Sequence, residues 1–182
     1  IAIKLLDDKV NVVRIGNENK VDELVKPAYL TSKIQQDRSF KLVQQLKNQS
    51  DDIRKQAVKY KRNFGKEEYQ ERKKLKKEIK SMRSDIRKIQ NDISKNVLEK
   101  AEVICGTFFS IQQFKLPLDK YDFLIIDEAG QAIEPAIWSV AHLGDKMVLA
   151  GDDLQLPPTV KSREAEKMGL AKSVLEIGRA HV

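Results

Sequence analysis

The sequence predicts an α/β fold, in which a partial parallel sheet is interrupted by an antiparallel helical hairpin. Two short apolar segments, residues 123–126 and 147–150, each end abruptly at acidic residues. Bulky apolar strands that carry polar groups at their carboxyl ends are typical of a buried parallel sheet. Between the first strand and these two, a long segment takes on a helical period flanked by charges. Strands that alternate with helices also favour a parallel arrangement.

The chain before residue 38 predicts one strand followed by mixed structure. Residues 10–16 indicate a short strand closed by Gly16, and a polar turn is expected at 17–19. A continuous helix over residues 20–35 is disfavoured, because Pro27 lacks the N–H donor that a helix interior needs.

The middle third predicts the hairpin, with helices at about 38–62 and 67–99. Its apolar residues recur at spacings of three and four, which is nearly a heptad period. Residues 63–66 form the turn-like break between the two helices. The apolar residues are Ile53, Ala57, Tyr60 and Phe64 in the first helix and Leu75, Ile79, Met82, Ile86, Ile89, Ile93 and Val97 in the second.

After Lys100 the heptad period stops and strands alternate with helices again. Strands are expected at 103–108, 121–126 and 146–150, with a connector at 116–119. Two helices complete the pattern. One covers residues 130–142, where Pro135 marks its start or a kink, and the other covers 162–175, interrupted by Gly169.

Composition excludes several classes of protein and places the positive charge in one segment. The 182 residues are 41% hydrophobic and 34% charged, as expected for a soluble globular protein with a heavily solvated part. No apolar stretch approaches the roughly 20 residues that span a bilayer, so neither a membrane partner nor a secretory leader is expected. Of the net charge of +7, residues 54–100 carry +10 and the remainder −3. The basicity therefore belongs to the hairpin.

Three residues receive a structural interpretation. The single cysteine, Cys105, excludes an internal disulfide and a cysteine-based zinc site, and fits a reducing compartment, the cytoplasm or the nucleus. Trp138 is expected to pack in the core, because Ile133 and Ile137 give its helix an apolar face. His142 ends that helix, where a cation is favourable beside the helix dipole, and it is assigned no catalytic role.

The acidic pair Asp127 and Glu128 is the first candidate for chemistry. Two adjacent carboxylates at a strand end can hold Mg²⁺ and polarise a water, which nucleoside-triphosphate hydrolysis requires. The alternative is that they are solvated acids at a strand end. Gln131 lies four residues beyond Asp127, where it could approach the nucleotide phosphates.

The stretch 151–159 is more specific. Gly151 permits a tight exit from the strand, and Asp152 places a short acid at its tip. Gln155 can donate to a phosphoryl oxygen without adding charge, which suits a sensor of the γ-phosphate. Pro157 and Pro158 stiffen the exit, so that a shift at Gln155 passes to the segment that follows. An ordinary proline-rich turn is the alternative.

These two motifs resemble motifs II and III of superfamily-one helicases. Asp-Glu-Ala-Gly-Gln at 127–131 and Gly-Asp-x-x-Gln-Leu-Pro-Pro-Thr at 151–159 are similar to the B-type group. That group contains the nonsense-mediated-decay helicase, senataxin and the immunoglobulin-mu-binding-protein helicase. Residues 1–3 resemble the end of motif Ia, 13–16 the strand before the family's helical insertion, and 104–107 the strand before motif II.

The resemblance implies a partial P-loop NTPase (RecA-like) motor domain at 1–37 and 100–175, with residues 38–99 as a helical insertion. It implies that Asp127 is the Mg²⁺ ligand, that Glu128 is the general base, and that Gln155 links the γ-phosphate to nucleic-acid binding. Thr107 and Ser110 are expected near the single strand. The resemblance implies that the protein uses ATP and Mg²⁺ and acts on single-stranded DNA or RNA. Many members of the family move 5′ to 3′ along the strand. The protein is expected to be monomeric.

Two parts of a complete motor are not found within the 182 residues. No Gly-x-x-x-x-Gly-Lys-Ser/Thr loop occurs, so the backbone cradle and lysine for the β- and γ-phosphates are missing, as is a second motor domain. We therefore expect no measurable ATP hydrolysis by residues 1–175 alone. The alternative function is a non-catalytic coiled-coil interaction protein with a degenerate nucleotide-binding fold, which the intact Glu128 and Gln155 disfavour.

The basic hairpin and the last residues leave questions open. A dense Lys/Arg surface gives sequence-blind, salt-sensitive binding to phosphates, or else only keeps a coiled hairpin soluble. The second interpretation is preferred, because few aromatic residues are present for base stacking. Residues 176–182 resemble a translated sequencing adapter, so no role is expected for them. The choice between DNA and RNA and the biological pathway do not follow from the sequence.

Overall fold

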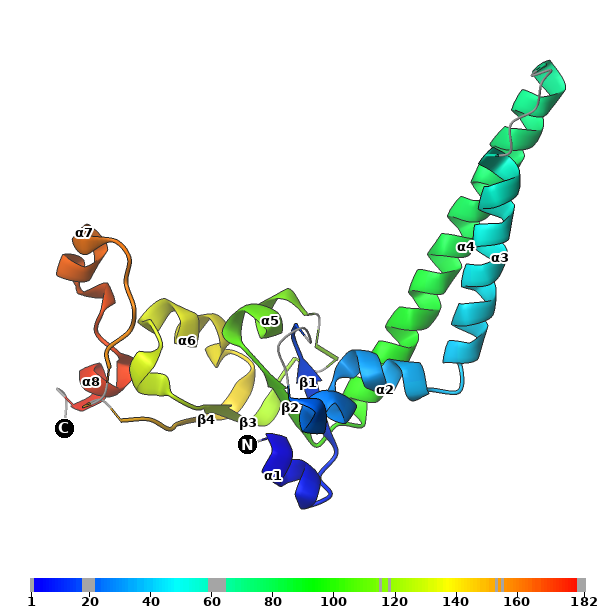
Figure 1. Ribbon diagram of the computed structural model, residues 1–182. Helices are drawn as coiled ribbons and strands as arrows, with labels where there is room; N and C mark the ends of the chain where they lie inside the picture. The colour runs from blue at the N-terminus through cyan, green and yellow to red at the C-terminus, as the bar shows by residue number, and fades with distance from the viewer. Residues whose placement is uncertain are drawn as a thin grey trace. The chain divides into compact units, whose positions relative to one another are not determined.

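The computed structural model describes residues 2–17, 22–58, 65–114, 116–117, 119–152, 154 and 156–179. The chain divides into two compact units, residues 1–105 and 106–182. Their helices and strands are labelled in Figure 1. Each unit has a hydrophobic cluster of its own.

The first unit holds a small sheet made of β1 (Val12–Ile15) and β2 (Val103–Gly106). Val12, Ala28 and Tyr29 are fully buried beside it, with Cys105 half-buried against the same cluster. The predicted strands are therefore confirmed, and Cys105 has the expected role of a small apolar strand residue. The helices around this sheet are α1 (Ala2–Asp7), the 3₁₀ helix η1 (Glu23–Ala28) and α2 (Leu30–Gln36).

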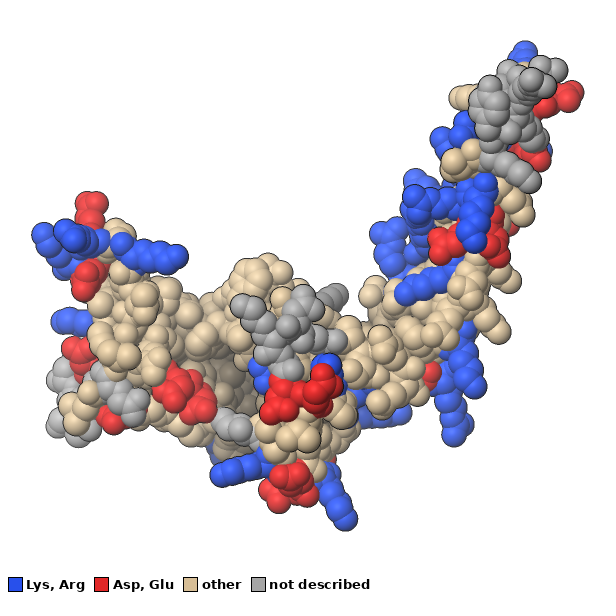
Figure 2. Space-filling model, viewed as in Figure 1, with Lys and Arg blue, Asp and Glu red and all other residues tan. Residues whose placement is uncertain are grey.

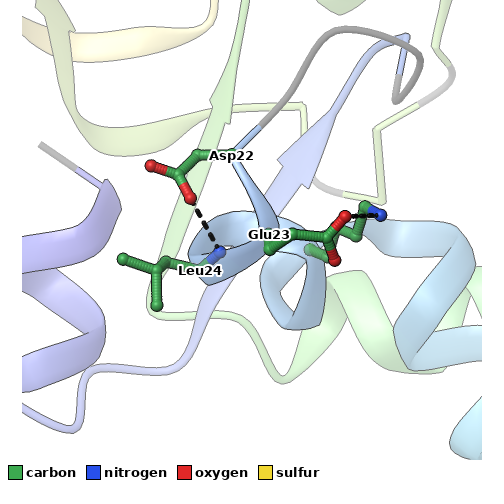
Figure 3. Close-up of polar contacts among 4 residues, drawn as sticks. Asp22, Glu23 and Leu24 are labelled. Carbon is green, nitrogen blue, oxygen red and sulfur yellow. Dashed lines mark hydrogen bonds and ion pairs between the residues drawn. The ribbon is translucent and has the colours of Figure 1, made fainter.

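The short helix η1 contains Pro27 and is capped by the residue before it. The Asp22 carboxylate accepts the backbone N–H of Leu24 at 3.0 Å and so caps the first turn (Figure 3). Glu23 and Lys26 form an exposed ion pair one turn apart. Pro27 lies inside η1, and the chain turns to an extended conformation at Tyr29 before α2 begins. The prediction that no continuous helix covers residues 20–35 is confirmed, although the break falls at Tyr29 and not at Pro27.

Asn11, directly before β1, is hydrogen-bonded to the segment that follows the hairpin. Its backbone N–H donates to Glu102 Oε2 at 2.8 Å, and its side-chain Nδ2 donates to the carbonyl of Lys100 at 2.6 Å. The Lys33 ammonium donates to Asn11 Oδ1 at 2.7 Å, and partial burial lowers the pKa of Lys33. One amide side chain therefore joins β1, α2 and the segment after the hairpin.

Helices α3 (Phe40–Val58) and α4 (Lys66–Glu99) pack against each other along the apolar stripe (Figure 1). Val43, near the start of α3, is buried with Ile86 and Ile93, near the end of α4. At the other end, Arg72 Nε donates to the carbonyl of Ala57 at 2.7 Å. The pair is therefore antiparallel. Its position as an insertion within one sheet stays a prediction.

The limits of the hairpin helices differ slightly from the sequence-based expectation. Helix α3 begins at Phe40 rather than at 38, because the Asp37 carboxylate accepts the N–H of Ser39 at 2.8 Å and holds a turn there. Helix α4 begins at Lys66, where Glu68 accepts the N–H of Gly65 at 3.0 Å. Residues 59–64, with Tyr60, Phe64 and half of the predicted turn, lie outside the described residues.

The second unit is built on the parallel pair β3 (Tyr121–Ile126) and β4 (Gly144–Leu149). Their register places Ile125 beside Val148 and Ile126 beside Leu149. The limits of both strands agree with the prediction to within two residues. The remaining elements are α5 (Phe108–Gln113), the 3₁₀ turn η2 (Ala129–Gln131), α6 (Glu134–Ala141), α7 (Arg163–Ala165), the π-helical turn η3 (Glu166–Leu170) and α8 (Val174–Arg179).

The sheet of the second unit is buried on one face only. Ile126 is buried together with Ile137 and Val140 of α6. On the other face, Phe123 is 57% exposed and Ile125 is 66% exposed. The helices of this unit therefore pack against a single side of the parallel pair.

Two further expectations for the second unit need correction. The helix expected at 130–142 is a 3₁₀ turn followed by α6, and Pro135 lies in the first turn of α6, where its missing N–H costs nothing. Trp138 is not in the core. It is 54% exposed, and its indole N–H donates to Glu134 Oε1 at 2.9 Å. Ile137 and Val140 lie on the buried face of α6, so Trp138, next to Ile137, points outward.

The remaining features of this unit agree with the sequence in part. Gly169 has φ +99° and interrupts the helical segment after residue 162, as predicted. Helix α8 extends to Arg179, into the segment predicted to be an adapter translation, and residues 180–182 lie outside the described part of the chain. Among the described residues, no helix is both long enough and apolar enough to cross a membrane.

Candidate functional site

A sharp turn at the carboxyl end of β3 carries the two candidate carboxylates. Glu128 has φ 55° and ψ 37°, a left-handed conformation that residues other than glycine rarely adopt. The Asp127 carboxylate accepts the N–H of Glu128 at 3.1 Å, which helps to hold this conformation. Both side chains are exposed. Backbone strain of this kind is common at functional sites and persists only where the surroundings fix it.

Gln131 is brought directly to Glu128. Its side-chain Nε2 donates to Glu128 Oε2 at 3.2 Å, and its backbone N–H donates to the carbonyl of Glu128 at 3.0 Å. The sequence suggested a contact between Gln131 and nucleotide phosphates. The sequence did not indicate the hydrogen bond from Gln131 to Glu128, the candidate general base.

The turn after β3 is bonded to the exit of β4. The N–H of Ala150 donates to the carbonyl of Ile126 at 2.8 Å, and the N–H of Ala129 donates to the carbonyl of Ala150 at 2.8 Å. Gly151 then passes so close that a Cβ atom there would lie 2.9 Å from the nitrogen of Ala129. The two strand ends therefore form one continuous hydrogen-bonded edge, and Gly151 is required for the close approach.

Asp152 follows on the same edge of the sheet. Its carboxylate accepts the N–H of Leu154 at 2.9 Å, and the side chain is exposed. Pro158 is buried, which anchors the segment after it. Gln155, the predicted γ-phosphate sensor, lies outside the described residues. The described part of the motif thus brings Asp152 to the edge that carries Asp127 and Glu128.

The edge that carries Asp127, Glu128 and Asp152, which we call the acidic edge, fits a hydrated magnesium ion better than a metal held wholly by protein. Within the described residues, no group of three or more His, Cys, Asp or Glu side chains could enclose a metal. Mg²⁺ usually keeps several waters and is bound by one or two carboxylates together with substrate phosphates. Asp127 uses one carboxylate oxygen for the bond to the N–H of Glu128, and the residue is exposed. Its role as a metal ligand stays a prediction.

Thr107 and Ser110 occupy the start of α5. Thr107 Oγ1 accepts the N–H of Ser110 at 3.3 Å and lies 2.9 Å from Ser110 Oγ, so it caps this helix. Helix α5 was not expected, although threonine is a favoured residue at a helix N-cap. The structure gives both hydroxyls a local structural role, and their predicted proximity to a single strand remains untested.

Comparison with known proteins finds a family and several relatives. A family model described as "AAA domain" matches residues 1–163. The DNA-binding protein SMUBP-2 of Rattus norvegicus is 43% identical over 61 residues, which is 34% of this chain and 6% of that protein. The regulator of nonsense transcripts 1 homolog of Drosophila melanogaster is 37% identical over 81 residues, 44% of this chain and 7% of that protein.

A third relative carries an activity in its name. The DNA polymerase alpha-associated DNA helicase A of Schizosaccharomyces pombe is 39% identical over 69 residues, 37% of this chain and 10% of that protein. The matched segments are short beside the relatives themselves, and this chain spans about 6% of the length of the first of them.

Proposed function

The chain belongs to the AAA domain family, and from this membership and the geometry of its acidic edge we propose that it forms part of the ATP-hydrolysing motor of a nucleic-acid helicase. The observation that carries the proposal is the bonded pair of strand ends, which brings Asp127, Glu128 and Asp152 to one edge of a parallel sheet. Nucleotide sites of parallel α/β sheets lie at this edge. Support also comes from relatives whose names describe a DNA helicase and a DNA-binding protein.

In the proposed architecture, residues 1–37 and 100–175 belong to one partial RecA-like motor domain. Residues 38–99 are then a helical hairpin inserted into it, and 176–182 are an adapter-derived tail. The phosphate-cradling loop and the second motor domain are supplied from outside these residues, because no Gly-x-x-x-x-Gly-Lys-Ser/Thr motif occurs among the 182.

The proposed mechanism is in-line attack of water on the γ-phosphate of ATP. Glu128 accepts a proton from the attacking water and orients it, while the hydrogen bond from Gln131 fixes the carboxylate. Asp127 would hold Mg²⁺, with Asp152 as a second acid near the phosphates. When bound, Mg²⁺ neutralises charge on the β- and γ-phosphate oxygens. Gln155 reports the state of the γ-phosphate to the nucleic-acid track.

The proposed partner is single-stranded DNA or RNA, with Thr107 and Ser110 close to the strand. A motor that acts on nucleic acid is expected in the cytoplasm or the nucleus, as a monomer. Strand movement follows if binding of ATP and its hydrolysis change the contacts that the segment after Gln155 makes with nucleic acid.

A Glu128→Gln substitution in the complete protein tests the proposal. We expect the nucleic-acid-stimulated ATPase rate constant, kcat, to fall by at least about 10²-fold, because the amide cannot accept the proton of the attacking water. Binding of ATP should persist. The matched control is Glu164→Gln on the exposed start of α7, which should leave kcat unchanged.

The proposal fails if Glu128→Gln retains the activity of the unchanged protein. If the complete protein shows no ATPase activity under any condition, the alternative of a non-catalytic coiled-coil interaction protein gains support instead.

A further inference from the structure

The hairpin sorts its charges onto two opposite edges. Its seam consists of the buried and half-buried residues that recur every three or four positions along α3 and α4. Four cations directly follow the seam residues Leu46, Ile53, Leu75 and Met82, which lie one heptad apart within each helix. Because the two helices are antiparallel, positions that follow the seam in both helices come to the same edge, which we call the basic edge. The four residues are Lys47 and Arg54 on α3, and Lys76 and Arg83 on α4.

The opposite edge carries the contrary charge. Positions that directly precede the seam on α4 are acidic at Glu78, Asp85 and Asp92, one heptad apart. On α3 the corresponding positions include the neutral Gln49 and Gln56. The four cations of the basic edge therefore lie on one side of the seam and the three acids of α4 on the other, while Lys74 and Lys88 lie outside the basic edge.

This arrangement works against the stability of the hairpin itself. Paired helices usually place opposite charges beside each other along an edge, where they attract. Here like charges of α3 and α4 share the basic edge and repel. The ion pairs in the described parts of the two helices join other residues, Lys55 with Asp52 at 3.2 Å and Lys95 with Glu99 at 3.7 Å. The four edge cations are exposed, so their charge is available to an external anion.

More cations widen the basic edge along α4. Lys73, Lys80 and Arg87 lie one position beyond its edge residues around the helix, all exposed. From Lys73 to Arg87 the helix rises about 21 Å, at 1.5 Å per residue. One strand of a duplex carries a phosphate about every 3.4 Å along its axis, so the edge matches about six phosphates. Figure 2 shows Lys and Arg side chains concentrated along the middle of the hairpin.

An aromatic side chain lies on the same edge. Tyr69 precedes Lys76 by one heptad, which gives it the same position around α4, and it is 57% exposed. Proteins that hold single strands combine a row of cations with aromatic rings on which bases stack. A membrane-binding helix, in contrast, needs an apolar face to insert, and the apolar face of α4 is covered by α3.

We propose that the basic edge of the hairpin binds the phosphodiester backbone of nucleic acid, with Tyr69 stacking on a base. The inference takes nucleic acid as partner from the proposed function, but it concerns a surface separate from the nucleotide site. Contact through cations along a straight helix does not read sequence, so binding on this edge is insensitive to base order.

The experiment measures nucleic-acid affinity over a range of salt concentrations, in the complete protein made hydrolysis-deficient by Glu128→Gln. One variant replaces the four cations of the basic edge with glutamine. A matched control replaces the same number of exposed lysines on the outer faces of the helices, at Lys41, Lys74, Lys77 and Lys88. Both variants lose the same net charge, so only the position of the charge differs between them.

Each lost phosphate contact should lower the magnitude of the slope of log affinity against log salt by about 0.7–0.9. For the basic-edge variant, which loses four such contacts, we therefore expect this magnitude to fall by about 3. At 0.1 M salt the affinity should fall by about 10²-fold. The control slope should change by less than about 1. The thermal midpoint of the basic-edge variant should be equal to or above that of the unchanged protein, because repulsion within the edge is removed.

A Tyr69→Ala variant tests the stacking contact separately. Its affinity for single strands should fall by about tenfold while the salt slope stays the same, and Tyr69→Phe should retain the affinity. Circular dichroism checks that each variant keeps its helix content.

Equal losses in the basic-edge variant and the control would overturn the inference, as would unchanged affinity in both. Tighter binding to vesicles of anionic lipid than to nucleic acid, with the same dependence on the four cations, would overturn it in favour of a membrane partner. If nucleic acid stimulates the ATPase activity of the unchanged protein but the affinity does not depend on the four cations of the basic edge, the inference fails and the proposed function stands. If binding depends on the edge but no ATPase activity exists, the proposed function fails.

Discussion

The hairpin and the acidic edge of the second unit are built in contrasting ways. The hairpin repeats one pattern over many residues, and its seam is specified by side chains at a regular spacing. The acidic edge depends on two turns, in which backbone atoms of Ala129 and Ala150 bond to each other and Gly151 leaves no room for a side chain. A repeated pattern spreads its stability over many contacts, whereas a site built from turns depends on a few atoms.

The largest effect on stability is expected in the seam of the hairpin. Ile86→Ala removes a buried side chain that packs with Val43 and Ile93, so the free energy of unfolding should fall by about 2–5 kcal/mol. Chemical denaturation followed by circular dichroism measures the change. Leu42→Ala is the control, because Leu42 is exposed on α3 and should cost less than about 1 kcal/mol. Equal losses in both variants would contradict the assigned seam.

A smaller effect on stability, with a larger effect on activity, is expected at Gly151. Gly151→Ala places a Cβ atom 2.9 Å from the nitrogen of Ala129 and 3.0 Å from that of Gly130, so the two strand ends must move apart. We expect a loss of about 1–3 kcal/mol in the free energy of unfolding. We also expect a fall in kcat of about tenfold or more, because the turn that holds Glu128 shifts.

Glu164→Gln, on the exposed start of α7, is the control for that substitution as well. It should leave both stability and kcat nearly unchanged. A Gly151→Ala protein with full activity would show that the two strand ends do not need their close contact.

The smallest effect is expected from Gln131, which acts through Glu128. Gln131→Met removes the donor to Glu128 Oε2 while keeping a side chain of similar length and adding no charge. The loss of one hydrogen bond of this kind should lower kcat by about 3- to 10-fold and leave the KM for ATP unchanged. If Gln131 contacts the phosphates instead, KM should rise, so steady-state kinetics at saturating nucleic acid separates the two roles.

The sequence predicted the repeated parts of the fold well. Spacings of three and four located the seam of α3 and α4, because only one helical face can be buried in a two-helix pair. The apolar runs located β3 and β4 for a similar reason, since bulky branched residues ended by acids fit the end of a parallel strand. Pro135 marked the start of α6, and the interruption predicted from Pro27 falls two residues later, at Tyr29.

The sequence could not predict the features that depend on contacts between elements. Trp138 was expected in the core, but the choice between Trp138 and its neighbour Ile137 depends on where β3 lies beside α6. Helix α5 was missed because its six residues are too few to show a period. The hydrogen bond between Gln131 and Glu128 follows from the left-handed conformation of Glu128, which no local pattern announces.

The central claim is that Asp127, Glu128 and Asp152 share one ATP site. The most direct test is a crystal structure of the complete protein with Mg²⁺ and a non-hydrolysable ATP analogue. We predict a metal-bound water within about 2.6–3.2 Å of Asp127, and the Glu128 carboxylate at the same distance from a water in line with the γ-phosphate. A nucleotide bound elsewhere, with these carboxylates remote from its phosphates, would contradict the account.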